Sequence, residues 1–273
     1  KLDKVESALP GVNCGGCGYA SCALYAQAIV EQDEELNLCV VGGAETTRDV
    51  ARVMGVEVSG EQHEKLVAVV FCQGDDEAAK FPGVYRGIED CAAAIYSQDV
   101  SKRCKYGCVG MGSCVKSCPF DAIHLSEGGI PYVDAEKCTA CGNCVRACPR
   151  DLIELHPVSH NSFVYCKSQD PGPVARKVCK KACIACKACV KAAAKDENED
   201  AVTMHGNLAV VTPDPYAAKP EYGAKCPTDA YASGINSIRK AEVLGHAPEG
   251  GEPMSEAPVT SGGEKVDAGG DEA

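Results

Sequence analysis

The chain has 273 residues, twenty of them cysteines, and a formal net charge of −12. It is longer than the small secreted domains that disulfides usually hold together, so its cysteines point to metal binding rather than to crosslinks. It contains no run of eighteen apolar residues, the length expected of a membrane-spanning helix. Sixteen of the cysteines can be sorted into four sets with the spacing that iron–sulfur clusters require.

The first set lies in a glycine-rich segment, GVNCGGCGYASC, near the start of the chain. Its spacing is C-x2-C-x4-C-x16-C, and its members are Cys14, Cys17, Cys22 and Cys39. Glycines 11, 15, 16 and 18 allow the backbone to curl close to a cluster and to offer amide N–H groups to its sulfurs. Residues 20–30 are typical of a short apolar helix. We therefore expect a small helical 4Fe-4S domain over residues 1–60 and a connecting segment over residues 61–100.

The next motif is a run of the bacterial ferredoxin type, C-x2-C-x2-C-x3-C-P. It consists of Cys138, Cys141, Cys144 and Cys148, followed by Pro149. The fourth cysteine of such a run ligates a neighbouring cluster, so one run implies a second. The second lies upstream in modified form, as Cys104, Cys108, Cys114 and Cys118. Met111 stands where its middle ligand is expected, and Cys104 is the obvious substitute.

Crossed ligation then predicts a two-cluster ferredoxin-like module over residues 101–157. One cluster would be held by Cys104, Cys108, Cys114 and Cys148. The other would be held by Cys118, Cys138, Cys141 and Cys144.

A third run has Ala193 where its fourth cysteine is expected. Cys226 completes it, because the sequence CPTDA from Cys226 matches CPFDA from Cys118. Upstream of Cys226, the positions of three further ligands hold Tyr216, Lys219 and Tyr222, so one cluster of this module has been lost. We expect a degenerate one-cluster ferredoxin-like module over residues 158–240, with the ligands Cys183, Cys186, Cys189 and Cys226.

An internal repeat supports two successive modules without reference to the cysteines. Residues 122–134 (AIHLSEGGIPYVD) match residues 201–213 (AVTMHGNLAVVTP). In both, alternating apolar residues flank a turn dipeptide, Gly128-Gly129 or Gly206-Asn207, so each segment is predicted to form a hairpin.

Four cysteines remain, namely Cys72, Cys91, Cys166 and Cys179. The sequence VVFCQGDD around Cys72 resembles FVYCKSQD around Cys166. Because the four contain no close ligand pair, we interpret them as buried thiols that pack as small apolar residues. The alternatives are a fifth cluster formed from these four, or competition of Cys179 for the cluster of the third run. The six histidines show no ligand spacing.

The charge is unevenly distributed. Residues 247–273 hold seven acidic groups and Lys265, a net charge of −6, so the rest of the chain carries −12 minus −6, or −6. Residues 241–273 are poor in large apolar residues and are predicted to form a disordered acidic tail. By contrast, a basic run without any acid surrounds the third run of cysteines, and it comprises Arg176, Lys177, Lys180, Lys181, Lys187, Lys191 and Lys195. Such a run can steer an acidic protein partner, or it can be a solvated face or a patch for another subunit or lipid headgroups.

Three segments together resemble the B subunit of the Rnf complex: LPGVNCGGCGYASC from Leu9, CKYGCVGMGSCVKSCP from Cys104 and CTACGNCVRACP from Cys138. The resemblance spans roughly residues 1–235. It implies 4Fe-4S clusters that relay electrons from reduced ferredoxin toward NAD within an ion-pumping membrane assembly. Members of that family usually begin with a membrane helix, so we expect an anchor helix that is absent from this sequence. The degenerate last module is the other departure from the family.

We therefore predict an α+β electron-transfer protein with four 4Fe-4S clusters and no catalytic residue of its own. The expected partners are reduced ferredoxin and other subunits of a membrane oxidoreductase complex at the cytoplasmic face of the membrane, without nucleic acid. No nucleotide-binding or nucleophile motif is visible. The alternatives are a soluble polyferredoxin or a reductive activator that serves a hydrogenase or a corrinoid enzyme, and a zinc-structured interaction module, since four thiolates can also bind zinc.

Overall fold

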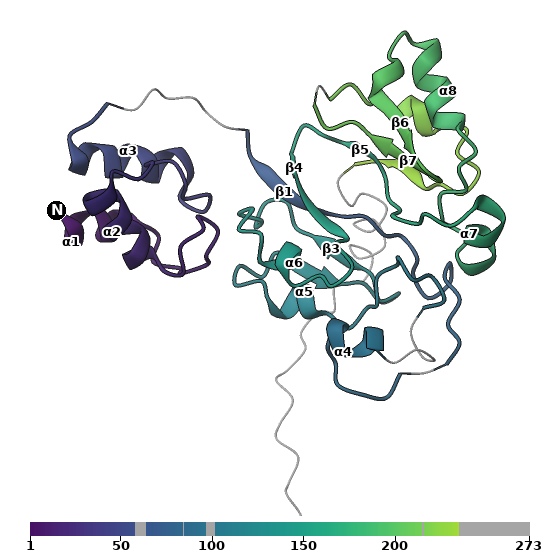
Figure 1. The fold of residues 1–273 in the computed structure, drawn as a ribbon, viewed down its shortest axis with the longest axis horizontal. Helices are drawn as coiled ribbons and strands as arrows, with labels where there is room; N and C mark the ends of the chain where they lie inside the picture. The colour runs from purple at the N-terminus through teal and green to yellow at the C-terminus, as the bar shows by residue number, and fades with distance from the viewer. Residues whose placement is uncertain (58–63, 84, 97–101, 215, 235–273) are drawn as a thin grey trace, which may run out of the picture.

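A computed structural model describes residues 1–57, 64–83, 85–96, 102–214 and 216–234. The chain combines short helices with two-stranded antiparallel sheets, in keeping with the mixed helix-and-strand class expected from the sequence. Figure 1 shows an N-terminal helical unit beside two units that contain the strands. The predicted acidic tail lies outside the described residues. Within the described residues, no helix has the length and apolar character needed to cross a bilayer.

The helical unit consists of α1 (Leu2–Ala8), α2 (Cys22–Gln32) and α3 (Gly43–Met54). Helix α2 starts where it does because the Ser21 side chain accepts a hydrogen bond from the Leu24 N–H at 3.2 Å, which caps the first turn. Val5, Tyr25, Ile29 and Val50 form the centre of its core. The helix predicted over residues 20–30 is confirmed, with both ends displaced by two residues.

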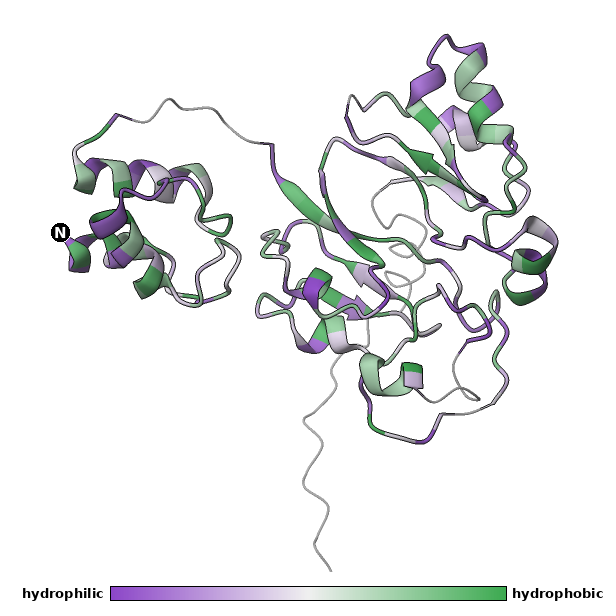
Figure 2. Ribbon diagram, in the orientation of Figure 1, coloured by the Kyte–Doolittle hydropathy of each residue, from purple (hydrophilic) through white to green (hydrophobic). Residues whose placement is uncertain are grey.

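The first strand-containing unit comprises β1 (Leu66–Val70), α4 (Cys91–Tyr96), α5 (Ser113–Lys116), β2 (Ile123–Leu125), β3 (Pro131–Val133), α6 (Asn143–Arg146) and β4 (Ile153–Pro157). Strands β2 and β3 form the hairpin predicted for this segment. Strand β1 pairs with β4 over its whole length. It arises from the segment expected only to connect two domains, yet its sequence LVAVV is buried after the first residue, and Figure 2 shows it as an apolar stripe. Burial of this strand makes it part of the unit's core.

The second unit comprises β5 (Ser162–Val164), α7 (Gly172–Val178), α8 (Ala188–Lys195), η1 (Glu199–Ala201), β6 (Val202–His205), β7 (Leu208–Val211), η2 (Pro220–Gly223) and β8 (Tyr231–Ser233). The predicted hairpin is again present, as β6 and β7. Gly206 takes a φ of +62° in its turn, a conformation that glycine adopts without strain. Strands β5 and β8 pair as β1 and β4 do, so the two units repeat one strand arrangement.

An aromatic cluster joins the two units. The Phe163 ring of β5 meets the Phe71 ring edge-on with 5.7 Å between ring centroids, and Tyr165 lies 6.2 Å from Phe71. Phe71 and Tyr165 each directly precede a cysteine, Cys72 and Cys166. Packing of the rings therefore brings these two cysteine-bearing segments together from opposite units.

Candidate iron–sulfur centres

The four cysteines predicted as the first set line a single cavity in the helical unit, namely Cys14, Cys17, Cys22 and Cys39. Backbone amides point at two of the sulfurs: the Gly16 N–H donates to Cys14 Sγ at 3.5 Å, and the Gly42 N–H donates to Cys39 Sγ at 3.4 Å. Such hydrogen bonds stabilise thiolate charge. The loop is therefore arranged to hold negatively charged sulfurs around a common space.

Cys39 is distant in sequence from the other three, and a buried tyrosine sets its position. The Tyr25 hydroxyl donates to the Glu35 carbonyl at 2.7 Å and accepts from the Leu38 N–H at 3.2 Å. Burial raises the pKa of Tyr25 above its usual value, so the hydroxyl keeps its proton and both hydrogen bonds. These bonds fix the segment that leads into Cys39, and the tyrosine itself lines the cavity.

A second cavity is lined by Cys118, Cys138, Cys141 and Cys144, the set predicted from crossed ligation. Apolar residues from both hairpin strands and from the β1–β4 pair complete its wall, among them Ile123, Val133 and Leu155. The pKa of the Cys144 thiol is raised to about 12, first by burial and then by the negative charge of the neighbouring thiolates Cys138, Cys141 and Cys118. Four thiolates this close repel one another unless positively charged iron lies between them.

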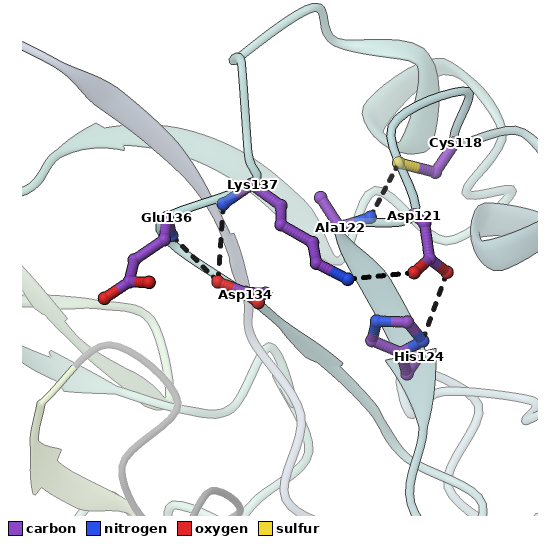
Figure 3. Close-up of polar contacts among 7 residues, drawn as sticks. All are labelled: Cys118, Asp121, Ala122, His124, Asp134, Glu136 and Lys137. Carbon is purple, nitrogen blue, oxygen red and sulfur yellow. Dashed lines mark hydrogen bonds and ion pairs between the residues drawn. The ribbon is translucent and has the colours of Figure 1, made fainter.

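Figure 3 shows how the turns that carry two of these cysteines are joined. The Ala122 N–H donates to Cys118 Sγ at 3.4 Å, and Asp121 accepts from Lys137 Nζ at 3.0 Å. Asp134 Oδ1 accepts from the Lys137 N–H at 3.3 Å, which shapes the turn just before Cys138. The ion pair also lowers the pKa of Asp121. Cys118 and Cys138 are thereby held on one side of the hairpin.

The three Cys-Pro turns of the chain have the same backbone shape. Each places an aspartate three residues after its cysteine with a φ of 49°, and these residues are Asp121, Asp151 and Asp229. In the first two turns, the backbone N–H four residues after the cysteine donates a hydrogen bond to its sulfur. The Ala122 N–H donates to Cys118 Sγ and the Leu152 N–H donates to Cys148 Sγ, each at 3.4 Å. Cys226 thus starts a turn of the same shape as those of Cys118 and Cys148, the two cysteines that are predicted to ligate across the ferredoxin-like module.

The predicted third set, Cys183, Cys186, Cys189 and Cys226, lies around the start of α8. The pKa of Cys189 is raised to about 11, mainly by burial, and the thiolates of Cys183, Cys226 and Cys186 raise it further. The structure thus brings Cys226 close to the third run, as the predicted set requires. Cys186 is the one exposed cysteine among the twenty.

Side chains occupy the region where a further cluster of this unit would lie. Ala193 is fully buried, Tyr222 is 3% exposed, and both belong to the core of the unit. The Tyr222 hydroxyl donates to Asp196 at 2.8 Å, and the Tyr216 hydroxyl donates to the Ser162 carbonyl at 3.0 Å. These tyrosines pack as core residues with satisfied hydroxyls, in place of the ligands of a full repeat.

The remaining predicted set is only partly brought together. Burial raises the pKa of Cys114 to about 12, and the negative charges of the Cys108, Cys91, Cys148 and Cys144 thiolates raise it further, so these four thiols all lie near Cys114. Cys104 instead lines a separate cavity with Cys72, Cys166 and Cys179. The sequence analysis assigned no ligand role to Cys72, Cys91, Cys166 or Cys179.

The first two cavities adjoin one another across the boundary between the helical unit and the first strand-containing unit. Gly16 packs so closely on the backbone of Cys141 that a Cβ at residue 16 would lie 3.2 Å from Cys141 Cα. Arg146 Nη2 donates to the Cys14 carbonyl at 3.4 Å. The ligand loop of one site therefore touches the ligand loop of the other.

The donor sets suit iron–sulfur clusters, which are held by cysteine thiolates. The side chains that line the two cavities are thiols, apolar and aromatic groups and small polar groups, with no charged group among the described residues. Among all the residues that the structure describes, no group of three or more His, Cys, Asp or Glu side chains is arranged to hold a single metal ion. Each set of four thiols instead surrounds a space between them.

Two family models match the chain in these regions. Residues 9–41 match a family described as "Putative Fe-S cluster", and residues 103–152 match the 4Fe-4S dicluster domain. The first match contains the whole of the first cysteine set. The second contains the eight cysteines from Cys104 to Cys148.

Curated proteins similar to the chain carry closely related names. The B subunit of the ion-translocating oxidoreductase complex of Methanosarcina acetivorans is 45% identical over 190 residues, which cover 70% of this chain and 71% of the relative. The B subunit of the Na(+)-translocating ferredoxin:NAD(+) oxidoreductase complex of Acetobacterium woodii is 43% identical over 86% of this chain and 69% of its own length. The proton-translocating counterpart of Clostridium ljungdahlii is 42% identical over 84% of this chain and 80% of its own length.

Proposed function

The chain belongs to the family of B subunits of the Rnf complex, the ion-translocating ferredoxin:NAD oxidoreductase, and on this premise we propose how it works as the electron-transfer subunit of such a complex. The observation that carries the proposal is the grouping of cysteines four at a time around shared cavities. When bound there, 4Fe-4S clusters supply one-electron redox chemistry at low potential. The protein supplies thiolates, amide N–H groups directed at sulfur, and apolar walls, which tune the potential of each centre.

Four clusters correspond to the sets around Cys14, Cys118, Cys183 and Cys114. The contact between the Gly16 loop and Cys141 links the first two sets directly. Electrons can therefore pass from the helical unit into the ferredoxin-like part of the chain without an intervening partner. The chain acts as a relay, and the reaction with NAD takes place on other subunits, so no residue here has a catalytic role.

The donor in this proposal is reduced ferredoxin, which docks on the basic run around the third set. Lys187 and Lys191 are exposed and follow the exposed Cys186, at the start and in the middle of α8. Of the seven basic residues in the run, only Lys181 forms an ion pair with another described residue, with Asp229 at 3.0 Å. The other cations are free to attract an acidic protein, and such long-range attraction raises the rate of encounter.

We place the chain at the cytoplasmic face of the membrane, together with the other subunits. Cysteine thiolates and low-potential clusters require a reducing compartment, which the cytoplasm provides. An anchor helix ahead of the helical unit would hold it there.

The first experiment measures iron, acid-labile sulfide and zinc in anaerobically purified protein. About sixteen or more irons per chain, with a matching amount of sulfide, support the relay. Zinc with almost no iron would contradict it, because a zinc site carries no redox chemistry.

The second experiment tests where ferredoxin docks, with Lys187→Glu combined with Lys191→Glu. The double substitution is expected to slow reduction by ferredoxin and to reduce the dependence of the rate on salt, since it reverses the local attraction. Lys1→Glu combined with Lys4→Glu makes the same change of charge at the start of the helical unit and is expected to leave the rate nearly unchanged. Equal rates in both double variants, at equal iron content, would show that docking occurs elsewhere.

A further inference from the structure

One cavity brings together four cysteines that come from both strand-containing units. It is lined by Cys72, Cys104, Cys166 and Cys179. Cys72 follows β1 and Cys166 follows β5, while Cys179 directly follows α7. No two of the four lie close together in the sequence, so their convergence is a product of the tertiary fold alone.

An internal repeat relates the four cysteines in pairs. Residues 104–108 read CKYGC and residues 179–183 read CKKAC, which makes Cys104 the counterpart of Cys179. The segments FCQGDD and YCKSQD in turn make Cys72 the counterpart of Cys166. Each unit thus contributes the same two positions to the cavity. Because both repeats bring their two cysteines to one cavity, the four form a single group rather than separate core thiols.

Backbone pairing holds two of the cysteine segments against one short stretch of chain. The Lys80 N–H donates to the Val178 carbonyl and the Lys180 N–H donates to the Ala78 carbonyl, at 2.9 and 2.8 Å, on either side of Cys179. The Arg103 N–H donates to the Lys80 carbonyl at 2.9 Å and so ties the residue before Cys104 to the same stretch. Residues 78–80 therefore align Cys104 and Cys179 on one wall.

Two of the sulfurs, those of Cys72 and Cys179, lie on either side of one glycine, and those of Cys72 and Cys166 accept amide hydrogen bonds. A Cβ at Gly74 would lie 3.2 Å from Cys179 Sγ and 3.8 Å from Cys72 Sγ, so one glycine separates the two sulfurs. The Cys108 N–H donates to Cys72 Sγ at 3.3 Å, and the Ser168 N–H donates to Cys166 Sγ at 3.4 Å. Amides directed at sulfur are the same feature that the first two sets show.

A buried cation provides a second, independent observation. Lys102 is only 5% exposed, lines the cavity and donates from Nζ to the Gly74 carbonyl. It forms no ion pair with any other described residue. A buried ammonium group without an anion is costly, and its burial is explained if an anionic group lies beside it. A cluster with four thiolates and a 2+ core, which carries a formal charge of about −2, is such a group.

A different cysteine takes the position that Cys104 leaves open in the ferredoxin-like set. The Cys91 N–H at the start of α4 donates to Ser113 Oγ at 2.7 Å, next to Cys114. Cys91 also packs in one apolar group with Val109 and Met111, the residues around the missing middle ligand. A residue far from the run in sequence is thus placed where the run itself lacks a cysteine.

We propose that Cys72, Cys104, Cys166 and Cys179 hold a fifth 4Fe-4S cluster, and that Cys91 completes the set of Cys108, Cys114 and Cys148. This inference rests on the proposed electron-relay function. It assigns all twenty cysteines to five sets of four. The fifth site lies where the two strand-containing units meet, so it joins the relay of the first unit to the exposed site of the second.

Cluster counting in cysteine variants tests the assignment through iron content and native mass, without a measurement of activity. Cys179→Ala is expected to remove about four irons per chain. If Cys179 were only an apolar core thiol, the substitution would remove none. Cys104→Ala combined with Cys179→Ala is expected to remove about four as well, because both belong to one cluster. Cys104→Ala combined with Cys108→Ala is expected to remove about eight. A loss of only about four in that last variant would return Cys104 to the set of Cys108 and overturn the proposal.

Native mass spectrometry of the unaltered protein gives a cluster count that does not depend on whether a variant folds. Five clusters, or about twenty irons per chain, support the fifth site. Four clusters, or about sixteen irons, would overturn it and leave the proposed relay function in place. Near-absence of iron would overturn both.

Discussion

The contact between the two ligand loops at Gly16 is expected to control how firmly the helical unit docks on the first strand-containing unit. A methyl group at residue 16 would lie 2.9 Å from Val40 Cγ2, 3.2 Å from Cys141 Cα and 3.3 Å from the Cys141 carbonyl oxygen. The valine side chain can shift, but the Cys141 atoms belong to the backbone of a ligand loop. Gly16→Ala is therefore expected to push the two loops apart.

The size of the effect follows from the cost of overpacking. One added methyl group at a closely packed contact typically costs about 1–3 kcal/mol. Since about 1.4 kcal/mol corresponds to a tenfold change in an equilibrium constant, the docking equilibrium should weaken by roughly 5- to 150-fold. The hydrogen bond from Arg146 to the Cys14 carbonyl spans the same boundary and should weaken with it.

Hydrogen exchange at the amides of residues 14–18 and 138–146 measures docking directly, and the rate of electron equilibration between the two centres measures its consequence. Both loops should exchange faster in Gly16→Ala, at unchanged iron content. Gly18→Ala is the matched control, because residue 18 has a φ of +91° and open space around it, so the variant strains the same loop without touching Cys141. Equal protection of residues 138–146 in both variants would refute the argument.

Two further predictions concern the junction of the two strand-containing units. Phe163→Ala should destabilise the protein by about 3–5 kcal/mol, because Phe163 is 2% exposed and packs against Phe71 and Tyr165. The anaerobic melting midpoint measures this loss. Phe81→Ala is the control, since Phe81 is 40% exposed and its loss should lower the midpoint much less. Burial, and then the charge of His156, lowers the pKa of His160 below its unfolded value of about 6.5. The unfolded chain therefore binds more protons, so stability is greatest above about pH 6.5 and declines as the pH falls below it. His160→Phe should flatten this decline in melting curves recorded between about pH 7.5 and 5. A wild-type melting midpoint that rises on acidification would contradict this sign.

Features whose partners lie close together along the chain could be predicted from the local sequence. The two hairpins were predicted from a turn dipeptide between alternating apolar residues, and both are present, because such a turn brings its flanking strands together without help from distant residues. The same holds for the three cysteines of a C-x2-C-x2-C run, which one loop presents together. The shared Cys-Pro motif also led to Cys226, since the motif encodes a turn whose shape the structure repeats three times.

Which distant cysteines lie together depends instead on how the folded chain packs. Nothing in the local sequence of β1 states that it pairs with β4, yet this pairing and the aromatic cluster around Phe71 bring Cys72 toward Cys166. Cys91 reaches the set of Cys114 because α4 is held to α5 through Ser113, and Cys104 lies with Cys179 because residues 78–80 bind both segments. From the spacing alone, Cys104 is the nearest substitute for the missing ligand beside Cys108. The hydrogen bonds that hold Cys91 beside Ser113 and Cys179 beside residues 78–80 are formed only after distant segments have packed together, so local spacing could not predict them.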